Sequence, residues 1–236
     1  MKRNILRSAL FVLASWLLLS SAFASEKAPK TTPAPAAAIS LPAPNTVASF
    51  PLAQALATRR SHRDLTDNEL GFDALAQLLW ASQGKSDDKN HRTAPSAMAR
   101  YALETYVVVA KVKGLAPGLY KYASATHTLT LLRAGDLRDS LVDQAIGQNW
   151  IKAAPALIVL NGVAERMVGK NGDSMVKFMY VEAGLAAQNV FLQVTALGLG
   201  STYVGGFKPA EVSRILALPT NEETIAILPV GTIRAQ

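Results

Sequence analysis

The longest helical segment of this chain constrains its fold more than any other stretch. Apolar residues recur at helical spacing from about Val176 to Leu197, and Gly198-Leu199-Gly200 ends the helix. Its middle carries four small residues, Ala183, Gly184, Ala186 and Ala187. Small side chains let another helix or a flat ring approach a helix backbone closely, so we expect this segment to be a packing surface.

Strand patterns and shorter helices alternate irregularly along the rest of the chain. Residues 106–109 have the β-branched run of a buried strand, 118–122 and 127–132 alternate as in a hairpin, and 156–160 read as a central strand. We expect Asp73 to cap a helix that Gly84 closes, and a second helix to begin at Asp136. A helix at 209–216 and strands at 201–204 and 224–230 complete the chain. Without a strict βαβ period, this mixture predicts an α+β sandwich.

The first residues have the pattern of a targeting segment. Lys2, Arg3 and Arg7 precede an apolar run from Ala9 to Leu19, and Ala22-Phe23-Ala24 forms an A-x-A cleavage site before Ser25. Residues 1–24 therefore predict a cleavable signal peptide, a periplasmic or secreted protein, and no stable membrane insertion after cleavage. An uncleaved anchor is the less favoured alternative, because the run is shorter than the roughly 20 residues of a membrane span.

Domain boundaries follow from a change in composition. Residues 25–49 are rich in Ala and Pro and carry no helical or strand period, which predicts a flexible linker. The folded domain is expected at residues 50–236, without internal repeats. With 50% hydrophobic residues, this part can bury one sizeable core.

Composition narrows the classes of function. The chain has no cysteine, which excludes disulfides and thiol catalysis. Signal cleavage removes three basic and no acidic residues, so the formal charge falls from +7 to +4, and the absence of a basic-aromatic stripe argues against nucleic-acid binding. The three histidines, His62, His91 and His127, lack ligand spacing, so no metal site is expected.

A dense cationic segment, Arg59-Arg60-Ser61-His62-Arg63, follows the helix-like run at 52–57. In a chain with only 17% charged residues, three guanidinium groups and a hydroxyl so close together favour a polyanion such as a phosphate, because guanidinium groups bind phosphate oxygens bidentately. The alternative is a basic helix end, where cations suit the C-terminal dipole.

Five segments in order carry a resemblance to a known family. They are 59–63, 94–97 (Ala-Pro-Ser-Ala), 182–189 (Glu-Ala-Gly-Leu-Ala-Ala-Gln-Asn), 198–201 (Gly-Leu-Gly-Ser) and 205–207 (Gly-Gly-Phe). Together, over residues 51–233, they resemble the nitroreductase family of FMN enzymes. Residues 79–84 and 118–122 are similar to the SagB-type branch, the dehydrogenases that make thiazoles and oxazoles in peptides. The resemblance implies a central, mostly antiparallel sheet flanked by helices.

The resemblance also implies a cofactor site for FMN. Arg59, Arg60, Ser61 and Arg63 match the family's phosphate and ribityl contacts, while Pro95, Ser96, Ala97 and Met98 match the loop along the flavin ring. Family members commonly have Gly at position 98 and Asn at position 99, where this chain has Met98 and Ala99, so ring contacts or substrate access are expected to differ. Gly205 and Gly206 match the loop whose backbone N–H faces flavin N5; the alternative is that they only form a turn.

Two other residues have competing interpretations. The azole-forming branch has a Lys-Tyr pair before the long helix, where this sequence has Lys170-Asn171. Lys170 is a candidate general base, but Asn cannot replace the acidity of a phenol, and the alternative is a solvated loop lysine. Glu182 is expected to be structural, capping the helix or pairing with an arginine.

Two classes of function follow from the resemblance. The first is an FMN-dependent oxidoreductase that acts on a small-molecule or peptidic substrate through flavin N5, as a homodimer packed through helix 176–197; a SagB-type azoline dehydrogenase is a variant of it. The second is a non-catalytic module that binds a flavin or another ligand, which export favours because nicotinamide donors are scarce outside the cytoplasm.

Overall fold

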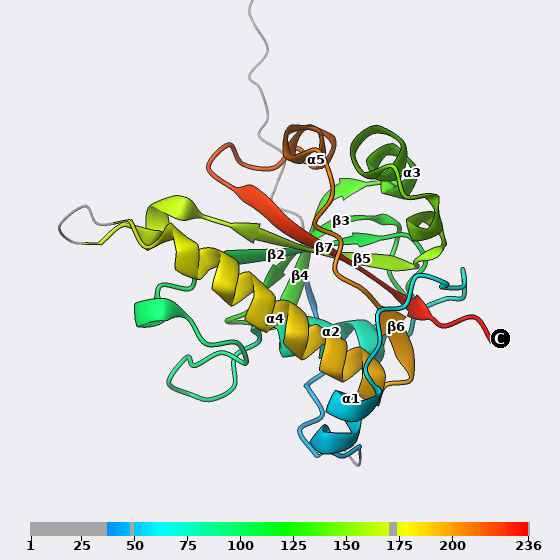
Figure 1. The fold of residues 1–236 in the computed structure, drawn as a ribbon, viewed down its shortest axis with the longest axis horizontal. Coiled ribbons are helices and arrows are strands. Elements are labelled where there is room, and N and C mark those ends of the chain that lie inside the picture. The colour runs from blue at the N-terminus through cyan, green and yellow to red at the C-terminus, as the bar shows by residue number, and fades with distance from the viewer. Residues whose placement is uncertain (1–36, 48–49, 170–173, 236) are drawn as a thin grey trace, which may run out of the picture. The chain divides into compact units, whose positions relative to one another are not determined.

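A seven-stranded antiparallel sheet forms the centre of the molecule (Figure 1). The computed structural model describes residues 37–47, 50–169 and 174–235. Within them the strand order is β1-β4-β3-β2-β5-β7-β6. The strands are β1 (Ala38–Ser40), β2 (Leu103–Val109), β3 (Gly118–Ala123), β4 (Thr128–Ala134), β5 (Ala156–Gly162), β6 (Leu199–Ser201) and β7 (Glu223–Thr232). The α+β class and the antiparallel sheet are confirmed.

Helices cover both faces of this sheet. They are α1 (Leu52–Thr58), α2 (Phe72–Gln83), α3 (Arg138–Leu141), α4 (Val176–Ala196) and α5 (Pro209–Leu216). Short turns of helix are η1 (Ala97–Ala99), η2 (Val142–Ile146), η3 (Asn149–Ala153) and η4 (Ala164–Met167). On one face α2 and α4 pack over Val107 and Ile158. On the other face α3, η2 and α5 pack over Val108 and Val159, so alternate residues of each central strand supply the two cores.

Helix α4 matches the predicted helix closely. It ends as expected where Gly198 takes a left-handed conformation with φ of 68°. Its small residues admit another helix as predicted, because Ala183, Ala186 and Ala187 are buried in the chain's own core with α2. The outward face of α4 is also apolar, and Phe178, Val181 and Leu185 are 37%, 55% and 40% exposed.

The linker prediction is wrong for its last part. Residues 38–40 form the edge strand β1, which pairs with β4, and Leu41 is buried. The Leu41 N–H donates to the His127 carbonyl at 3.1 Å, and the Asn45 N–H donates to Gln77 Oε1 at 2.8 Å. Backbone pairing, which composition does not reveal, therefore adds residues 38–45 to the folded domain. The predicted signal peptide and the rest of the linker lie outside the described residues, apart from Ala37, Thr46 and Val47.

Several predicted boundaries need correction. Helix α2 has Gly71 as its N-cap, and Asp73 lies in the first turn without a capping hydrogen bond, where its carboxylate suits the helix dipole. Gly84 closes α2 as predicted. The strand predicted at 201–204 is β6, at 199–201, because Gly198 ends α4 directly before it. Among the described helices, none is long and apolar enough to cross a membrane.

Candidate functional site

The cationic segment Arg59–Arg63 runs from the end of α1 along β6. Arg59 caps α1 by donating its N–H to the Ala55 carbonyl at 2.9 Å, and the His62 N–H donates to the Ser201 carbonyl at 3.0 Å. A Cβ at Gly200 would lie 2.9 Å from the Cβ of His62, so only glycine permits this approach. The segment is thus fixed to the sheet edge by its backbone, which leaves its side chains available.

The three arginines of this segment differ in what they contact. Arg60 Nη1 donates to the carbonyls of Ala57 at 3.1 Å and Arg59 at 2.8 Å, so Arg60 covers the end of α1 as the alternative interpretation expected. The side chains of Arg59 and Arg63 have no hydrogen bond or ion pair with any residue in the described ranges. Ser61 is exposed between them. Two of the four predicted phosphate ligands, Arg59 and Arg63, therefore have guanidinium groups without a partner in the described ranges.

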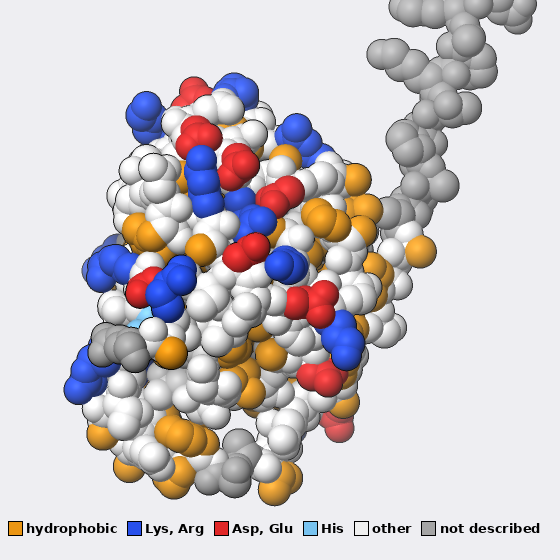
Figure 2. All heavy atoms as spheres, turned by 90° about the vertical axis from the view of Figure 1, so that its right-hand side faces the viewer, with side chains coloured by type: hydrophobic (Ala, Val, Ile, Leu, Met, Phe, Trp, Pro, Cys, Tyr) orange, Lys and Arg blue, Asp and Glu red, His pale blue; other side chains and the backbone are white. Residues whose placement is uncertain are grey.

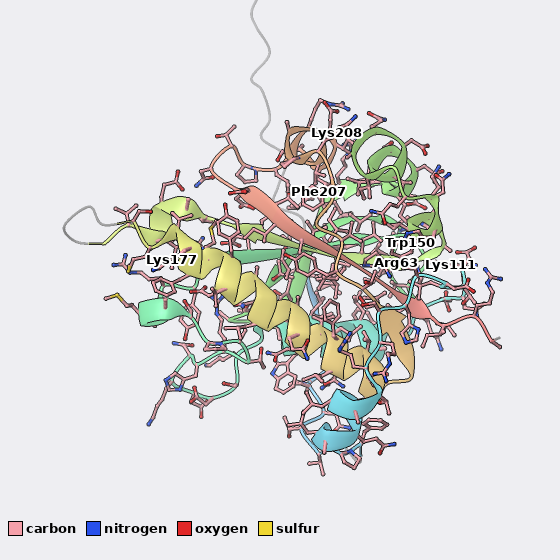
Figure 3. The ribbon with its side chains drawn as sticks, in the orientation of Figure 1. Arg63, Lys111, Trp150, Lys177, Phe207 and Lys208 are labelled. Carbon is pink, nitrogen blue, oxygen red and sulfur yellow. The ribbon has the colours of Figure 1, made fainter. Side chains whose placement is uncertain are left out.

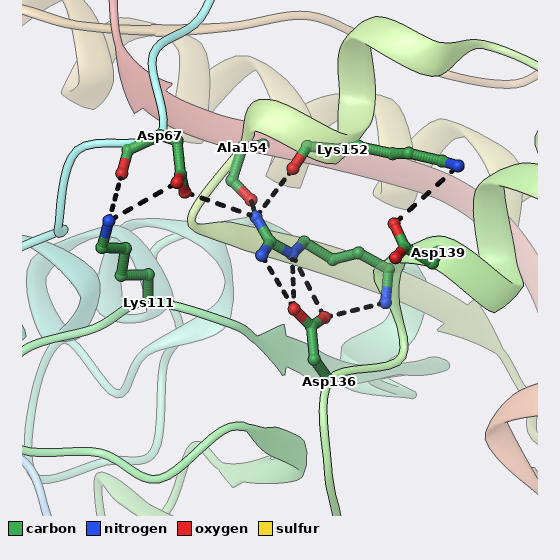
Figure 4. Close-up of polar contacts among 7 residues, drawn as sticks. Asp67, Lys111, Asp136, Asp139, Lys152 and Ala154 are labelled. Carbon is green, nitrogen blue, oxygen red and sulfur yellow. Dashed lines mark hydrogen bonds and ion pairs between the residues drawn. The ribbon is translucent and has the colours of Figure 1, made fainter.

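The acids that follow this segment in sequence, Asp64 and Asp67, have other partners in the chain, and Figure 4 shows those of Asp67. Asp64 Oδ1 accepts from Arg234 Nε at 2.8 Å. The Asp67 backbone carbonyl accepts from Lys111 Nζ at 2.9 Å, and its carboxylate lies 3.9 Å from Arg138. Arg138 in turn binds Asp136 and the carbonyls of Lys152 and Ala154. This network fixes the chain that follows the cationic segment.

The surface on this side of the molecule has mixed charge. Figure 2 shows basic and acidic side chains interspersed over the upper part and apolar side chains gathered toward the lower part. No broad field of one sign covers the face in this view. Any anion bound by Arg59 and Arg63 is therefore recognised locally rather than attracted by the whole face.

Gly205 and Gly206 follow β6 in a loop that is held at both ends. Val204 exchanges two backbone hydrogen bonds of 3.0 Å with Ile227, and the Lys208 N–H donates to the Ala145 carbonyl at 2.9 Å. Both glycines are exposed, and a Cβ at Gly206 would meet nothing within 4 Å. The loop thus borders open space, and β6 connects it to the segment that carries Arg59 and Arg63.

The other predicted ring contacts lie on the N-terminal half of α4. Ser96 Oγ and the Ala97 N–H both donate to Glu182 Oε1, each at 2.8 Å. Glu182 is structural as predicted, but its partners among the described residues are Ser96 and Ala97 rather than an arginine. Pro95 and Met98 are exposed beside these anchored residues.

Lys170 lies outside the described residues, but its flanks can be placed. Val168 pairs with Ser174 in an isolated β-bridge. Arg100 Nη1 donates to the carbonyls of Arg166 at 3.3 Å and Val168 at 3.1 Å. The segment before Lys170 therefore adjoins the loop at 95–101.

The predicted site residues thus form two groups at opposite ends of α4. The first group, Arg59–Arg63 with Gly205 and Gly206, borders β6 just beyond the helix C-terminus. The second group, Pro95–Met98, is anchored at Glu182, fourteen residues before Ala196, or about 21 Å along the axis at about 1.5 Å per residue. In Figure 3, Arg63 and Lys177 mark these two ends.

Sequence reasoning missed two features of this region. The apolar stripe at 178, 181 and 185 has the spacing of one helix face, so a helical projection of the sequence would find it. The left-handed conformations of Met98, Ala99 and Tyr101 have no sequence signal, because none of these residues favours them.

A polar cluster lies at one end of the central strands, and it is only partly satisfied, because Asn161 Oδ1 and the hydroxyls of Thr105 and Thr224 are buried without a partner among the described residues. Glu222 accepts from Tyr106 Oη at 2.9 Å and Asn161 Nδ2 at 3.0 Å, and Lys121 pairs with Glu104 at 3.0 Å. Burial, and then the hydrogen bond to Glu222, raise the pKa of the Tyr106 phenol. Within the part of the chain that the structure describes, no group of acids and histidines could hold a metal ion.

Comparisons with known proteins identify the family and the fold of this chain. The nitroreductase family model matches residues 56–232. A candidate nitroreductase of Methanocaldococcus jannaschii, MJ1384, is 34% identical over 180 residues, which cover 76% of this chain and 90% of that protein. A solved candidate nitroreductase from Ralstonia eutropha superposes with a TM-score of 0.74 at 29% identity, covering 86% of this chain and 94% of that one.

A third relative adds a name that mentions a flavin. The NADPH-flavin oxidoreductase of Vibrio harveyi is 27% identical over 119 residues, covering 46% of this chain and 50% of that protein. The family model and the Methanocaldococcus relative each cover most of the chain, and the solved Ralstonia structure shares its fold. This chain therefore belongs to the nitroreductase family.

Proposed function

We propose that this protein is an exported, FMN-dependent oxidoreductase that acts on a small-molecule or peptidic substrate through flavin N5. One observation carries the proposal: Arg59 and Arg63 have no partner among the described residues and lie on the segment that packs against β6, the strand that leads into the exposed loop at Gly205 and Gly206. Guanidinium groups without partners suit a phosphorylated ligand. Family membership favours a flavin as that ligand.

Each residue of this group has a defined task in the proposed site. Arg59 and Arg63 would bind the phosphate through charge-assisted hydrogen bonds, with Ser61 as a further donor. Arg60 contributes positive charge, although its guanidinium is held by the carbonyls of Ala57 and Arg59. The exposed glycine loop would offer a backbone N–H to the ring at Gly206, where a Cβ would meet nothing within 4 Å. When bound, FMN supplies the redox chemistry.

We also propose that the active form is a homodimer. An antiparallel pairing of two α4 helices about a two-fold axis would bring the group at one end of α4 in one subunit next to the other group in its partner. The exposed Phe178, Val181 and Leu185 supply an apolar surface for this pairing. An open depression of about 370 Å³ between α1, α2 and α4, lined in part by Leu52 and Leu192, extends the surface. The site would then be complete only in the dimer.

The simplest test separates a flavoenzyme from a non-catalytic module. Purified protein is loaded with FMN, and flavin absorbance is followed through dithionite reduction and reoxidation in air. We expect tight FMN binding and a complete cycle. Binding without reoxidation by any added acceptor would support the non-catalytic module, and no binding would refute the proposal.

The sequence argues against azoline oxidation as the reaction. Abstraction of a carbon-bound proton requires a positioned base with an acid or cation to balance charge, and Lys170 with Asn171 lacks the phenol of the azole-forming branch. We therefore expect Lys170→Ala to leave flavin reduction by dithionite and reoxidation in air unchanged. The matched variant Asn171→Tyr restores the Lys-Tyr pair. Azoline oxidation by the wild type, abolished in Lys170→Ala with FMN still bound, would instead assign the SagB-type reaction.

Export is proposed from the N-terminal sequence alone. Fractionation of cells that express the full chain should recover a protein that begins at Ser25 outside the cytoplasm. An intact Met1 N-terminus in the cytoplasmic fraction would contradict the proposal.

A further inference from the structure

The loop that follows Ser96 has an unusual backbone. Three of its non-glycine residues, Met98, Ala99 and Tyr101, have positive φ values of 53°, 52° and 48°. L-amino acids rarely adopt this region, and such residues persist only where the surrounding structure fixes them. Their concentration in four positions indicates that the loop holds a required shape.

Buried Glu182 fixes the start of this loop from α4. Its side chain is only 3% exposed, and one carboxylate oxygen accepts both the Ser96 hydroxyl and the Ala97 N–H. The Ser96 oxygen in turn accepts the Tyr101 N–H at 2.7 Å, which closes the loop on itself. Glu182 therefore controls both the entry and the return of the loop.

Two arginines fix the end of the loop. Arg166 Nη1 donates to the Tyr101 carbonyl at 2.9 Å, and Arg100 donates to the carbonyls of Arg166 and Val168. The guanidinium of Arg92 lies 4.3 Å from the centre of the Tyr101 ring. With both ends bound, the central residues have little freedom to relax.

The side chain presented by this fixed loop is Met98. It is 73% exposed, although it is large and apolar. Its loop docks at Glu182, within one helical turn of the outward residues Phe178, Val181 and Leu185. In the proposed dimer, which pairs α4 with its copy, this exposed side chain would lie at the edge of the interface.

We propose that Glu182 is a positioning residue that holds Met98 beside the flavin of the partner subunit, where Met98 limits the width of the substrate. This inference rests on the proposed FMN homodimer. A thioether side chain offers bulk and apolar contact but no strong hydrogen bond, so it selects by size and flatness. The substrate class is a narrow, flat electron acceptor.

The test compares two quinones with the same reactive ring. The FMN-loaded dimer is reduced with dithionite, and its reoxidation is timed with 1,4-benzoquinone and with 2,6-di-tert-butyl-1,4-benzoquinone. Each quinone takes two electrons and one proton from the anionic reduced flavin, which returns to oxidised FMN, and a second proton from water, to give the hydroquinone. The ratio of the two rates measures discrimination by width.

Variants of the two residues separate the size selection by Met98 from the positioning role of Glu182. Met98→Gly suits the positive φ and should raise the relative rate with the bulky quinone by roughly tenfold, while Met98→Leu should keep the wild-type ratio. Glu182→Ala should also raise the relative rate with the bulky quinone. Glu182→Gln retains an acceptor oxygen for Ser96 and Ala97 and should restore the wild-type ratio, and Glu69→Gln on the exposed surface is the matched control.

Each outcome assigns success or failure to a particular claim. An FMN-loaded dimer whose Met98→Gly variant keeps the wild-type ratio overturns this inference and leaves the proposed function intact. A Glu182→Ala variant that loses thermal stability but keeps the ratio overturns the positioning role. A wild-type protein that binds no FMN overturns the proposed function, and this inference with it.

Discussion

The two ends of α4 differ in how their polar groups are satisfied. At the C-terminal end, Arg59 and Arg63 have no partner in the described ranges, although Asp64 and Asp67 lie close in sequence. At the N-terminal end, Glu182, Arg100 and Arg166 each bind backbone or side-chain groups of the same chain.

This difference indicates that the two ends of α4 have different roles, ligand binding at one end and structural support at the other. Ionic groups that have partners within the chain fix local structure, and adding a ligand would require breaking those contacts. Ionic groups without partners cost little to leave solvated and gain most from an external counter-ion. The C-terminal end therefore has the character of a binding site, and the N-terminal end that of a scaffold that presents Met98.

Loss of both unpaired arginines should have the largest effect. A charge-assisted hydrogen bond contributes about 1.5–3 kcal/mol, so Arg59→Ala with Arg63→Ala should weaken FMN binding by about 3–6 kcal/mol if the effects add. Quenching of flavin fluorescence on titration measures the change. Arg60→Ala is the matched control, because Arg60 already binds carbonyls of α1. An equal loss of FMN affinity in the three single variants, Arg59→Ala, Arg60→Ala and Arg63→Ala, would contradict the distinction between Arg60 and the two arginines without partners.

A charge on the outward face of α4 should have the next largest effect. Leu185→Glu would bury a carboxylate in the proposed interface at a cost of about 2 kcal/mol or more, roughly a thirtyfold weaker dimer. FMN affinity should fall with it, since the loop of the partner is lost. Light scattering and flavin titration check both effects, and Leu132→Glu on the exposed edge of β4 is the control. A wild-type monomer that binds FMN fully would contradict the dimer.

The sequence predicted the C-terminal end of α4 better than the N-terminal end. The boundaries of α4 and α5 follow from local signals, such as Gly198 after α4 and Pro209 at the start of α5. The cationic segment was equally visible. The sequence does not show that one of its arginines is structural and two lack partners, because this depends on which carbonyls lie within reach of each side chain.

The scaffold end depends on contacts that are distant in sequence. Glu182 meets Ser96 across 86 positions, and no local pattern indicates such a pair. Strand β1 was missed for a similar reason, since three residues in an Ala/Pro-rich stretch form a strand only because the edge of β4 offers backbone partners.

Loss of the buried carboxylate should destabilise the scaffold end moderately. Glu182→Ala leaves the Ser96 hydroxyl and the Ala97 N–H without their acceptor, which we expect to lower the free energy of unfolding by about 1–3 kcal/mol. Chemical denaturation of the apoprotein measures this change. Glu182→Gln should lose less, because its amide oxygen can still accept. A smaller loss in Glu182→Ala than in Glu182→Gln would contradict this account of the loop.

The smallest expected effect lies away from both ends, where the segment after β1 contacts the turn between β3 and β4. Tyr122 Oη lies 2.8 Å from His127 Nδ1, and Nε2 lies 2.9 Å from the Pro42 carbonyl. The carbonyl requires a proton on Nε2, so the neutral ring leaves Nδ1 to accept from Tyr122. Burial lowers the pKa of His127 below its usual value of 6.5, although the bond to Pro42 opposes this.

Acid should therefore loosen this segment before it affects either end of α4. Because the pKa of His127 is lower in the folded state, the unfolded state binds more protons once the pH falls below about 6.5. The contribution of His127 to the free energy of unfolding is therefore fully present above that pH and is lost as the pH falls through the folded pKa. Hydrogen exchange of the Leu41 amide, corrected for its intrinsic rate, should quicken between pH 7.5 and 5.5 relative to Thr66, whose amide binds the Thr232 carbonyl at 2.8 Å. His127→Asn keeps a residue that tolerates positive φ and removes the titration, so its exchange ratio should not change with pH. If Leu41 and Thr66 respond to acid equally in the wild type, acid acts on the whole fold and His127 is not the sensitive group.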